Sequence, residues 1–304
     1  MASKIFLGPE REDVFVEAIK ASGCELVSSI EDADGIIWFG RDPAALESAI
    51  TPNVKWLQIP DAGAEKWIDS PILTLGITVT CASGIYGHQV AEHALALILG
   101  CYRHLGTFAK QSNWNPTAAN MQSLSGAQVL IVGAGGIGSS LATMLKPLQS
   151  ITTVMSKSGR VVQDADRSLP FSDFEKAIPS SDIIVLAAPA TSETYQMINS
   201  KTLSMMKPNA LIINVARGSL IDTNALLAAL DSGSIFAAGL DVTDPEPLPD
   251  NHPLFNHPRV LLTPHVANPP ALKKASFARH VEENCRKFSL GQTLLGVIDL
   301  RRGY

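Results

Sequence analysis

The chain has 304 residues, of which 46% are hydrophobic and 17% are charged, and its formal net charge is -5 at pH 7. This composition is typical of a globular protein long enough for two domains. The weak negative charge offers no basic field for nucleic acid, and no apolar run approaches the roughly 20 residues that cross a bilayer. Residues 1–7 show no signal-peptide pattern. We therefore expect a cytoplasmic protein that binds neither nucleic acid nor membranes.

The four cysteines are far apart in the sequence and form no C-x-x-C pair. Such spacing favours free thiols in a reducing compartment over disulfides or a metal site. We expect no bound metal.

The first hundred residues alternate between β-rich runs and amphipathic helical stretches. Strands are predicted at residues 4–7, 25–28, 35–39, 54–59 and 77–81, and helices at 13–21 and 44–50. This alternation predicts a parallel sheet covered by helices. The turn at 60–64 follows a strand end, where open α/β sheets bind ligands. Its residues Ala62, Gly63 and Ala64 either bind a substrate carboxylate or form an ordinary turn.

A long helix is predicted over residues 87–105, where apolar side chains recur at helical spacing. His88 and His93 on this helix are expected to be structural or surface residues. The polar, irregular stretch 106–125, which contains Trp114, is typical of a dimer arm or a lid.

A glycine-rich turn follows the predicted strand 127–132 and precedes a predicted helix over 139–148. Gly133, Gly135 and Gly138 have the G-x-G-x-x-G spacing, with Gly136 and Ile137 between them. In this motif the glycines permit the turn, the approach of a pyrophosphate and close packing of helix on strand. A diphosphate would bind at the helix N-terminus.

A second parallel sheet is predicted beyond this turn, which makes the unit a doubly wound dinucleotide-binding domain. Its further strands are predicted at 151–155, 182–188, 210–215, 236–242 and 260–263, with helices at 202–206 and 225–230. A final helix at 271–290 can return the chain to the first domain.

The end of the second strand of this domain selects the dinucleotide. NAD sites usually carry an acidic residue there for the ribose hydroxyls, whereas this chain has Ser156, Lys157, Ser158 and Arg160. Hydroxyls and two cations suit a 2′-phosphate. We predict that NADP(H) is preferred and that NAD(H) is possible, with a solvated basic loop as the alternative.

Arg217, Glu246 and His265 each follow a predicted strand of the second sheet, so they can converge at one edge. Chemistry at a 2-hydroxy acid needs a fixed cation for the carboxylate and a proton donor or acceptor that works near neutral pH. Arg217 suits the first task and His265 the second. A carboxylate at Glu246 would stabilise the charged imidazolium and fix its tautomer.

These motifs resemble the D-isomer-specific 2-hydroxyacid dehydrogenase family, in particular its glyoxylate/hydroxypyruvate reductase type. The resemblance runs through residues 90–96, 133–138, 214–218, 239–242, 246–248 and 263–265. It implies an α/β fold of two doubly wound parallel-sheet domains. The flavodoxin-like substrate domain would span 1–98 plus 286–304, and the Rossmann dinucleotide-binding domain would span 99–285. Homodimers are also implied.

The resemblance assigns roles by position. Arg217 binds the substrate carboxylate and keto oxygen, Glu246 pairs with His265, and His265 is the acid/base. Asp241 lies near the nicotinamide carboxamide, and residues 62–64 receive the substrate carboxylate. The remaining implied cofactor contacts are Pro189 and Thr194, in a Pro-x-Thr-x-x-Thr turn, and Ala216.

The chain departs from the family at three places: Ser156 stands where an aspartate is common, Val266 and Ala267 follow His265 where a glycine is usual, and the turn at 61–65 lacks the Gly-x-Asp form. The leading prediction is a reductase of small 2-ketoacids such as glyoxylate or hydroxypyruvate. Its rivals are an NAD-dependent phosphoglycerate-type dehydrogenase and a dinucleotide-sensing, corepressor-like protein without activity.

Overall fold

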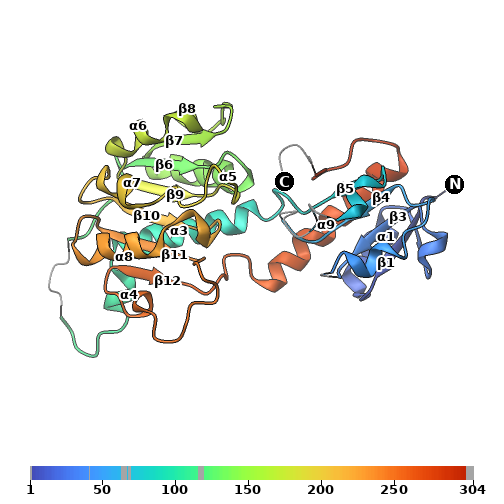
Figure 1. Ribbon diagram of the computed structural model, residues 1–304, viewed down its shortest axis with the longest axis horizontal. Coiled ribbons are helices and arrows are strands. Elements are labelled where there is room, and N and C mark those ends of the chain that lie inside the picture. Colours follow the sequence, from blue (N-terminus) through green and yellow to red (C-terminus); the bar gives the residue numbers. More distant parts are fainter. Residues whose placement is uncertain (1, 41, 63–66, 68–69, 116–119, 299–304) are drawn as a thin grey trace. The chain divides into compact units, whose positions relative to one another are not determined.

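The computed structural model describes residues 2–40, 42–62, 67, 70–115 and 120–298 (Figure 1). It divides the chain into two compact units, one comprising Met1–Tyr86 with Pro269–Tyr304 and the other comprising Gly87–Asn268. We call them unit 1 and unit 2.

The boundaries differ from the predicted ones, which cut through two helices. Helix α3 (Gly87–Tyr102) packs on α5, β10 and β11, so all of it belongs to unit 2. Helix α9 (Pro270–Ser289) packs on α1, so all of it belongs to unit 1. A helix buried along one face follows the sheet that covers this face, and the sequence does not state which sheet that is.

Unit 1 contains a five-stranded parallel sheet with the order β2-β1-β3-β4-β5. This is the 2-1-3-4-5 order of flavodoxin-like folds. Each of the five strands predicted from the first hundred residues is present. The bounds are β1 Lys4–Gly8, α1 Asp13–Ala21, β2 Glu25–Val27, β3 Gly35–Trp38, α2 Ala44–Glu47, β4 Trp56–Gln58 and β5 Thr78–Thr80.

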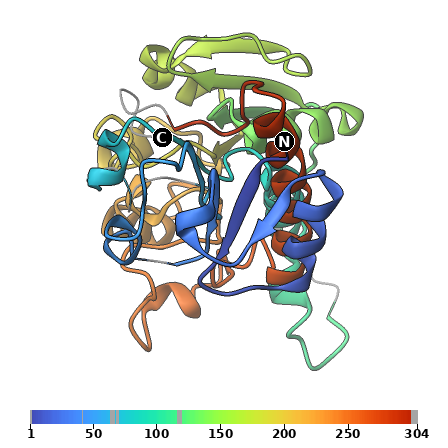
Figure 2. The ribbon, with the colours of Figure 1, turned by 90° about the vertical axis from the view of Figure 1, so that its right-hand side faces the viewer.

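Helices α1 and α9 pack side by side in unit 1 (Figure 2). Phe15 of α1 meets Phe277 of α9 edge to face, with ring centroids 5.7 Å apart. Alternate residues of the strands face these helices, among them Ile5 and Leu7 of β1, and the residues between them contribute to a second apolar cluster. A parallel sheet covered on both faces needs apolar side chains on both, as this one has.

Unit 2 contains a seven-stranded parallel sheet with the order β12-β11-β10-β9-β6-β7-β8 (Figure 1). Counted from β6, this is the 3-2-1-4-5-6 order of a Rossmann domain with one strand added. The strands are β6 Gln128–Val132, β7 Ile151–Ser156, β8 Arg167–Pro170, β9 Ile183–Leu186, β10 Leu211–Asn214, β11 Ala237–Leu240 and β12 Val260–Leu262. The helices are α3, α4 Leu105–Phe108, α5 Gly136–Leu145, α6 Phe174–Ala177, α7 Ser200–Ser204 and α8 Thr223–Asp231.

Strands β6, β9 and β10 of unit 2 are apolar on both faces. Val129, Ile131 and Ile213 join the cluster of α3 and α5, whereas Leu130 and Ile212 join the cluster of α7 and α8. Strand β8 escaped prediction because Arg167-Ser-Leu-Pro170 is a half-exposed edge strand without an apolar run. Among the described residues, no helix combines the length and the hydropathy that crossing a bilayer requires.

Candidate active site

The predicted functional residues of unit 2 gather at the carboxyl edge of its sheet. Strand order reverses between β6 and β9, which is the topological switch point where doubly wound folds bind ligands. Gly133 follows β6 there with φ +121°, and a Cβ on it would lie 2.4 Å from the carbonyl oxygen of Ala187, which follows β9. Only glycine permits this approach.

The glycine-rich turn fits a dinucleotide pyrophosphate. A Cβ on Gly138 would collide with the carbonyl oxygen of Gly133, whereas a Cβ on Gly135 would meet nothing within 4 Å. Helix α5 begins at Gly136, so the N–H groups of its first turn lack partners within the helix. Open space beside free donors at a helix N-terminus is what an anion requires. Ile137 is half-buried and packs into the core behind this turn.

The loop after β7 carries the two predicted cations. The backbone N–H of Arg160 donates to Ser156 Oγ at 3.0 Å, which closes the loop, and the guanidinium donates to the carbonyl oxygen of Ala134 in the glycine-rich turn. Lys157 Nζ lies 3.0 Å from Glu193 Oε1, and both side chains are largely exposed. Ser158 is exposed. Arg160 is thus beside the pyrophosphate turn, while Lys157 is paired with a carboxylate.

The Pro189–Thr194 segment after β9 is closed by one hydroxyl. Thr194 Oγ1 donates to the carbonyl oxygen of Pro189 at 2.8 Å and accepts from the N–H of Thr191 at 2.8 Å. The buried Thr194 therefore shapes a turn at the switch point.

Arg217 lies three residues beyond β10 in a turn fixed by the buried side chain of Asn214. The Asn214 amide donates to the carbonyl oxygen of Arg217 at 2.9 Å and accepts from the N–H of Ala216 at 3.0 Å. The Arg217 guanidinium donates to the carbonyl oxygen of Ala216 at 2.8 Å. A Cβ on Gly218 would lie 1.9 Å from the carbonyl oxygen of Thr243, so this turn packs directly on the chain beyond β11.

His265 and Glu246 are in contact. His265 Nδ1 lies 2.6 Å from Glu246 Oε1, and both side chains are about half-exposed. His265 has φ +53°, a left-handed conformation that is unfavourable for a residue with a Cβ. Such strain is often found at functional sites.

Asp241 follows β11 and is 2% exposed. Its carboxylate accepts hydrogen bonds from Thr263 Oγ1 at 2.6 Å and from the N–H groups of Val266 at 2.9 Å and Ala267 at 3.0 Å. Burial favours the neutral acid, but these bonds and the contact with His93 outweigh it and lower the Asp241 pKa to about 2. Asp241 is therefore ionised at neutral pH.

His93 is a residue that the sequence left as structural or surface. Its Nε2 lies 2.9 Å from Thr263 Oγ1 and 3.3 Å from Asp241 Oδ1. No spacing connects a residue of α3 with β11 and β12, so only the folded chain shows this contact.

The predicted substrate turn belongs to unit 1. Ala62 is exposed, and its carbonyl oxygen lies 3.8 Å from Cys81 Sγ. Gly63 and Ala64 lie outside the described residues.

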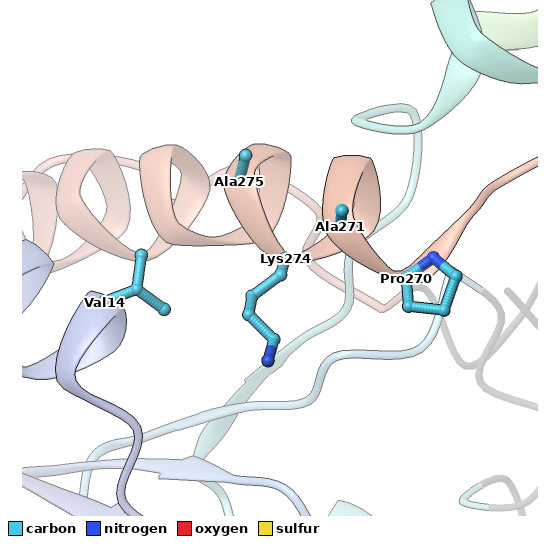
Figure 3. Close-up of a pocket in the computed structure, with 5 residues that line it drawn as sticks. All are labelled: Val14, Pro270, Ala271, Lys274 and Ala275. Carbon is cyan, nitrogen blue, oxygen red and sulfur yellow. The ribbon is translucent and has the colours of Figure 1, made fainter.

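Unit 1 also has a surface hollow of about 450 Å³ between α1 and the start of α9 (Figure 3). Its lining is Val14, Pro270, Ala271, Lys274 and Ala275. The Lys274 ammonium pairs with Glu12, so the lining offers no group suited to acid/base chemistry near neutral pH.

Residues 95–267 match the family model described as "D-isomer specific 2-hydroxyacid dehydrogenase, NAD binding domain". The match spans more than half of the chain and nearly all of unit 2. The chain belongs to the D-isomer-specific 2-hydroxyacid dehydrogenase family. A glyoxylate reductase from Thermofilum pendens is 35% identical over 254 residues, which cover 80% of this chain and 75% of that protein.

Two further comparisons cover nearly the whole chain, one in sequence and one in fold. A protein of Corynebacterium melassecola, named only for its position in the proB 3′ region, is 36% identical over 99% of this chain and 100% of its own. A D-isomer-specific 2-hydroxyacid dehydrogenase from Xanthobacter autotrophicus, solved with NADPH and MES, has a TM-score of 0.85 at 24% identity, with both chains fully covered.

Membership of the D-2-hydroxyacid dehydrogenase family makes this chain an oxidoreductase that acts on small 2-hydroxy or 2-keto acids with a nicotinamide dinucleotide. The two-domain α/β fold that the sequence predicted is confirmed, as is the family.

Proposed function

We propose that the chain is an NADPH-preferring reductase of small 2-ketoacids such as glyoxylate or hydroxypyruvate. The observation that carries this proposal is the 2.6 Å contact between His265 Nδ1 and Glu246 Oε1 at the sheet edge that also holds Arg217. A histidine whose Nδ1 donates to a carboxylate keeps a defined tautomer and has its Nε2 left for substrate.

Each of the three residues has one task. Arg217 binds the substrate carboxylate and polarises the keto oxygen, since a guanidinium matches a carboxylate in bidentate geometry. His265 Nε2–H protonates this oxygen, and the Glu246 carboxylate stabilises the imidazolium before the transfer. The bound dinucleotide supplies the hydride that adds to C2 of the substrate.

The dinucleotide is held by Gly133, Gly135, Gly136, Ile137 and Gly138, with further contacts from Pro189, Thr194 and Ala216. Its 2′-phosphate would bind to Ser156, Lys157, Ser158 and Arg160, because residues 156–160 include no carboxylate. It would compete there with Glu193, which pairs with Lys157. The NADPH in the Xanthobacter structure supports this preference. NAD(H) remains usable because the pyrophosphate turn serves both dinucleotides.

We further propose that unit 1 is the substrate domain, with residues 62–64 receiving the substrate carboxylate through backbone N–H groups. The chain forms a homodimer in the cytoplasm through unit 2, where Trp114 is 96% exposed. Light scattering on the purified chain measures the subunit number.

Absorbance of NADPH and of NADH against a panel of 2-ketoacids tests the proposed activity. We expect turnover of glyoxylate or hydroxypyruvate, faster with NADPH at low cofactor concentration. A 3-phosphorylated ketoacid used preferentially with NADH would favour a phosphoglycerate-type enzyme. Tight NADPH binding without turnover of any acid would indicate a dinucleotide sensor.

A further inference from the structure

Three consecutive backbone N–H groups converge on one buried residue. The N–H of His265 donates to the carbonyl oxygen of Asp241 at 2.7 Å, and the N–H groups of Val266 and Ala267 donate to its carboxylate. In the turn at residues 265–267, each of the three N–H groups thus donates to Asp241, and the N–H of His265 is shared with the carbonyl oxygen of Thr263. The strained φ of His265 persists because this turn over-determines it.

The hydrogen positions around Asp241 follow from its charge. An ionised carboxylate only accepts, so the 2.6 Å contact requires the Thr263 hydroxyl to donate its single hydrogen to Asp241 Oδ1. Thr263 Oγ1 can then only accept from His93 Nε2, 2.9 Å away. His93 must therefore carry its hydrogen on Nε2. The chain of donors runs from His93 through Thr263 to Asp241.

We propose that His93 and Thr263 are positioning residues, which act through the buried Asp241 carboxylate to hold the left-handed backbone of His265 and so direct its imidazole for proton transfer. The proposal rests on the proposed function for the step that His265 performs. The positioning itself is independent of the substrate.

The same contacts give Asp241 a structural role beside the expected one. Its Oδ1 has three neighbours within 3.3 Å, namely Thr263 Oγ1, the N–H of Val266 and His93 Nε2, and its Oδ2 accepts from Ala267. A carboxylate that is 2% exposed and already bonded to the protein at both oxygens is suited to anchoring a turn. We therefore assign Asp241 to the support of His265, and the expected contact with the nicotinamide carboxamide stays a separate prediction, because a carboxylate has about four acceptor sites.

The test removes one hydroxyl at nearly constant volume. Thr263→Val removes the hydroxyl that accepts from His93 and donates to Asp241, whereas Thr263→Ser keeps both bonds. We expect kcat to fall about tenfold in Thr263→Val and to stay within about twofold of the unaltered chain in Thr263→Ser. The dissociation constant of NADPH, measured by fluorescence, should change by less than about twofold in both.

A second pair of variants addresses His93. His93→Leu removes the donor and should lower kcat about fivefold, while His93→Gln, whose amide N–H can donate, should recover most of it. The matched control is His257→Leu, because His257 Nε2 also lies near a carboxylate, 3.4 Å from Asp231 Oδ1, and is similarly enclosed. His257 precedes β12 at the opposite edge of the sheet, so kcat should not change.

A readout without turnover separates this proposal from the proposed function. Ring resonances of His265, assigned by their loss in His265→Gln, are recorded on the chain free of dinucleotide and substrate. They should move in Thr263→Val and His93→Leu, and stay in place in Thr263→Ser and His257→Leu. If the unaltered chain reduces no 2-ketoacid, the proposed function fails and these spectra still decide the positioning.

Two outcomes would overturn the proposal. Unchanged kcat and unchanged His265 resonances in both Thr263→Val and His93→Leu would leave the hydrogen bonds without influence on His265. A weaker NADPH affinity at unchanged saturated kcat would make them part of the dinucleotide site. If Thr263→Val does not fold, the comparison of His93→Leu with His93→Gln decides in its place.

Discussion

The loop after β7 and the loops after β10, β11 and β12 lie at the same edge of one sheet, yet they are held in different ways. Lys157, after β7, forms an ion pair with Glu193, after β9, and these side chains are 78% and 54% exposed. After β11, Asp241 is 2% exposed and bonded to the protein at both oxygens. The first arrangement is open to solvent, and the second is fixed by burial.

This difference has a physical consequence for each region. An exposed ion pair is screened by water and salt and contributes little, about 0–1 kcal/mol, so the loop after β7 can exchange one partner for another. A buried, fully bonded carboxylate cannot be removed without leaving its donors unpaired. We infer that the loop after β7 influences which dinucleotide binds. The loops after β10, β11 and β12 hold the proposed catalytic residues in fixed positions.

His265→Gln, in the loop after β12, should have the largest effect on turnover. Glutamine has no titratable proton, so kcat for 2-ketoacid reduction should fall by about 10²–10⁴-fold. Stopped assays at saturating NADPH measure the loss, and fluorescence titration should give an unchanged NADPH affinity. His257→Gln serves as the control. A variant with full activity would remove His265 from the mechanism.

In the loop after β7, the double variant Lys157→Ala with Arg160→Ala tests the proposed 2′-phosphate site. Each lost charge-assisted contact costs about 1.5–3 kcal/mol when desolvated and less in this exposed loop, so NADPH affinity should fall about thirtyfold. NADH lacks the phosphate and should lose less than about threefold. Titration of both dinucleotides into the same preparation gives the ratio. Equal losses would make the loop a basic surface without a role in selection.

The fold was predictable because local patterns determine it. Apolar strands alternating with helices predicted both parallel sheets, and the glycine spacing predicted the turn between a strand and a helix at Gly133. The domain boundaries were not predictable, because α3 and α9 each have an apolar face that could pack on either sheet. Strand β8 has no apolar pattern at all, because an edge strand needs none.

Some residues of the candidate site could likewise be predicted from the sequence, and others could not. Arg217, Glu246 and His265 follow strands of one sheet, and the structure brings His265 and Glu246 into contact. Their roles in turnover stay predictions. The contacts of His93 and the burial of Asp241 had no signal in the sequence, because they depend on how α3 packs against the ends of β11 and β12. Residues 63 and 64 lie outside the described part of the chain.

Asp241→Asn measures how much the buried, ionised carboxylate after β11 contributes to the stability of the fold. The folded pKa of about 2 lies below the ordinary 3.8, so the ionised group stabilises the fold at higher pH. At about 1.4 kcal/mol per pKa unit, the contribution is about 2 kcal/mol at pH 7. It is fully present above about pH 4 and is lost as the pH falls towards 2.

Urea unfolding at several pH values checks this linkage. The variant should be less stable than the unaltered chain at pH 7, and the difference should shrink between pH 4 and pH 2. Asp231→Asn, at a carboxylate that is 73% exposed, should show no such trend. A pH-independent difference would mean that the ionised form of Asp241 contributes nothing to stability.

Glu193→Gln should have the smallest effect, and it tests directly whether the exposed Lys157–Glu193 pair influences NADPH affinity. Glu193 Oε1 lies 3.0 Å from Lys157 Nζ. A 2′-phosphate that binds Lys157 must therefore compete with the Glu193 carboxylate for the same ammonium group. Replacing the carboxylate with an amide should tighten NADPH binding about two- to threefold and leave NADH unchanged, since exposed pairs of this kind contribute under about 1 kcal/mol. The gain should disappear in a Lys157→Ala background, because the competition needs the lysine. Tighter binding that persists there would mean that Glu193 repels the phosphate directly, and the β7 loop would then select its cofactor by net charge rather than by exchange of partners.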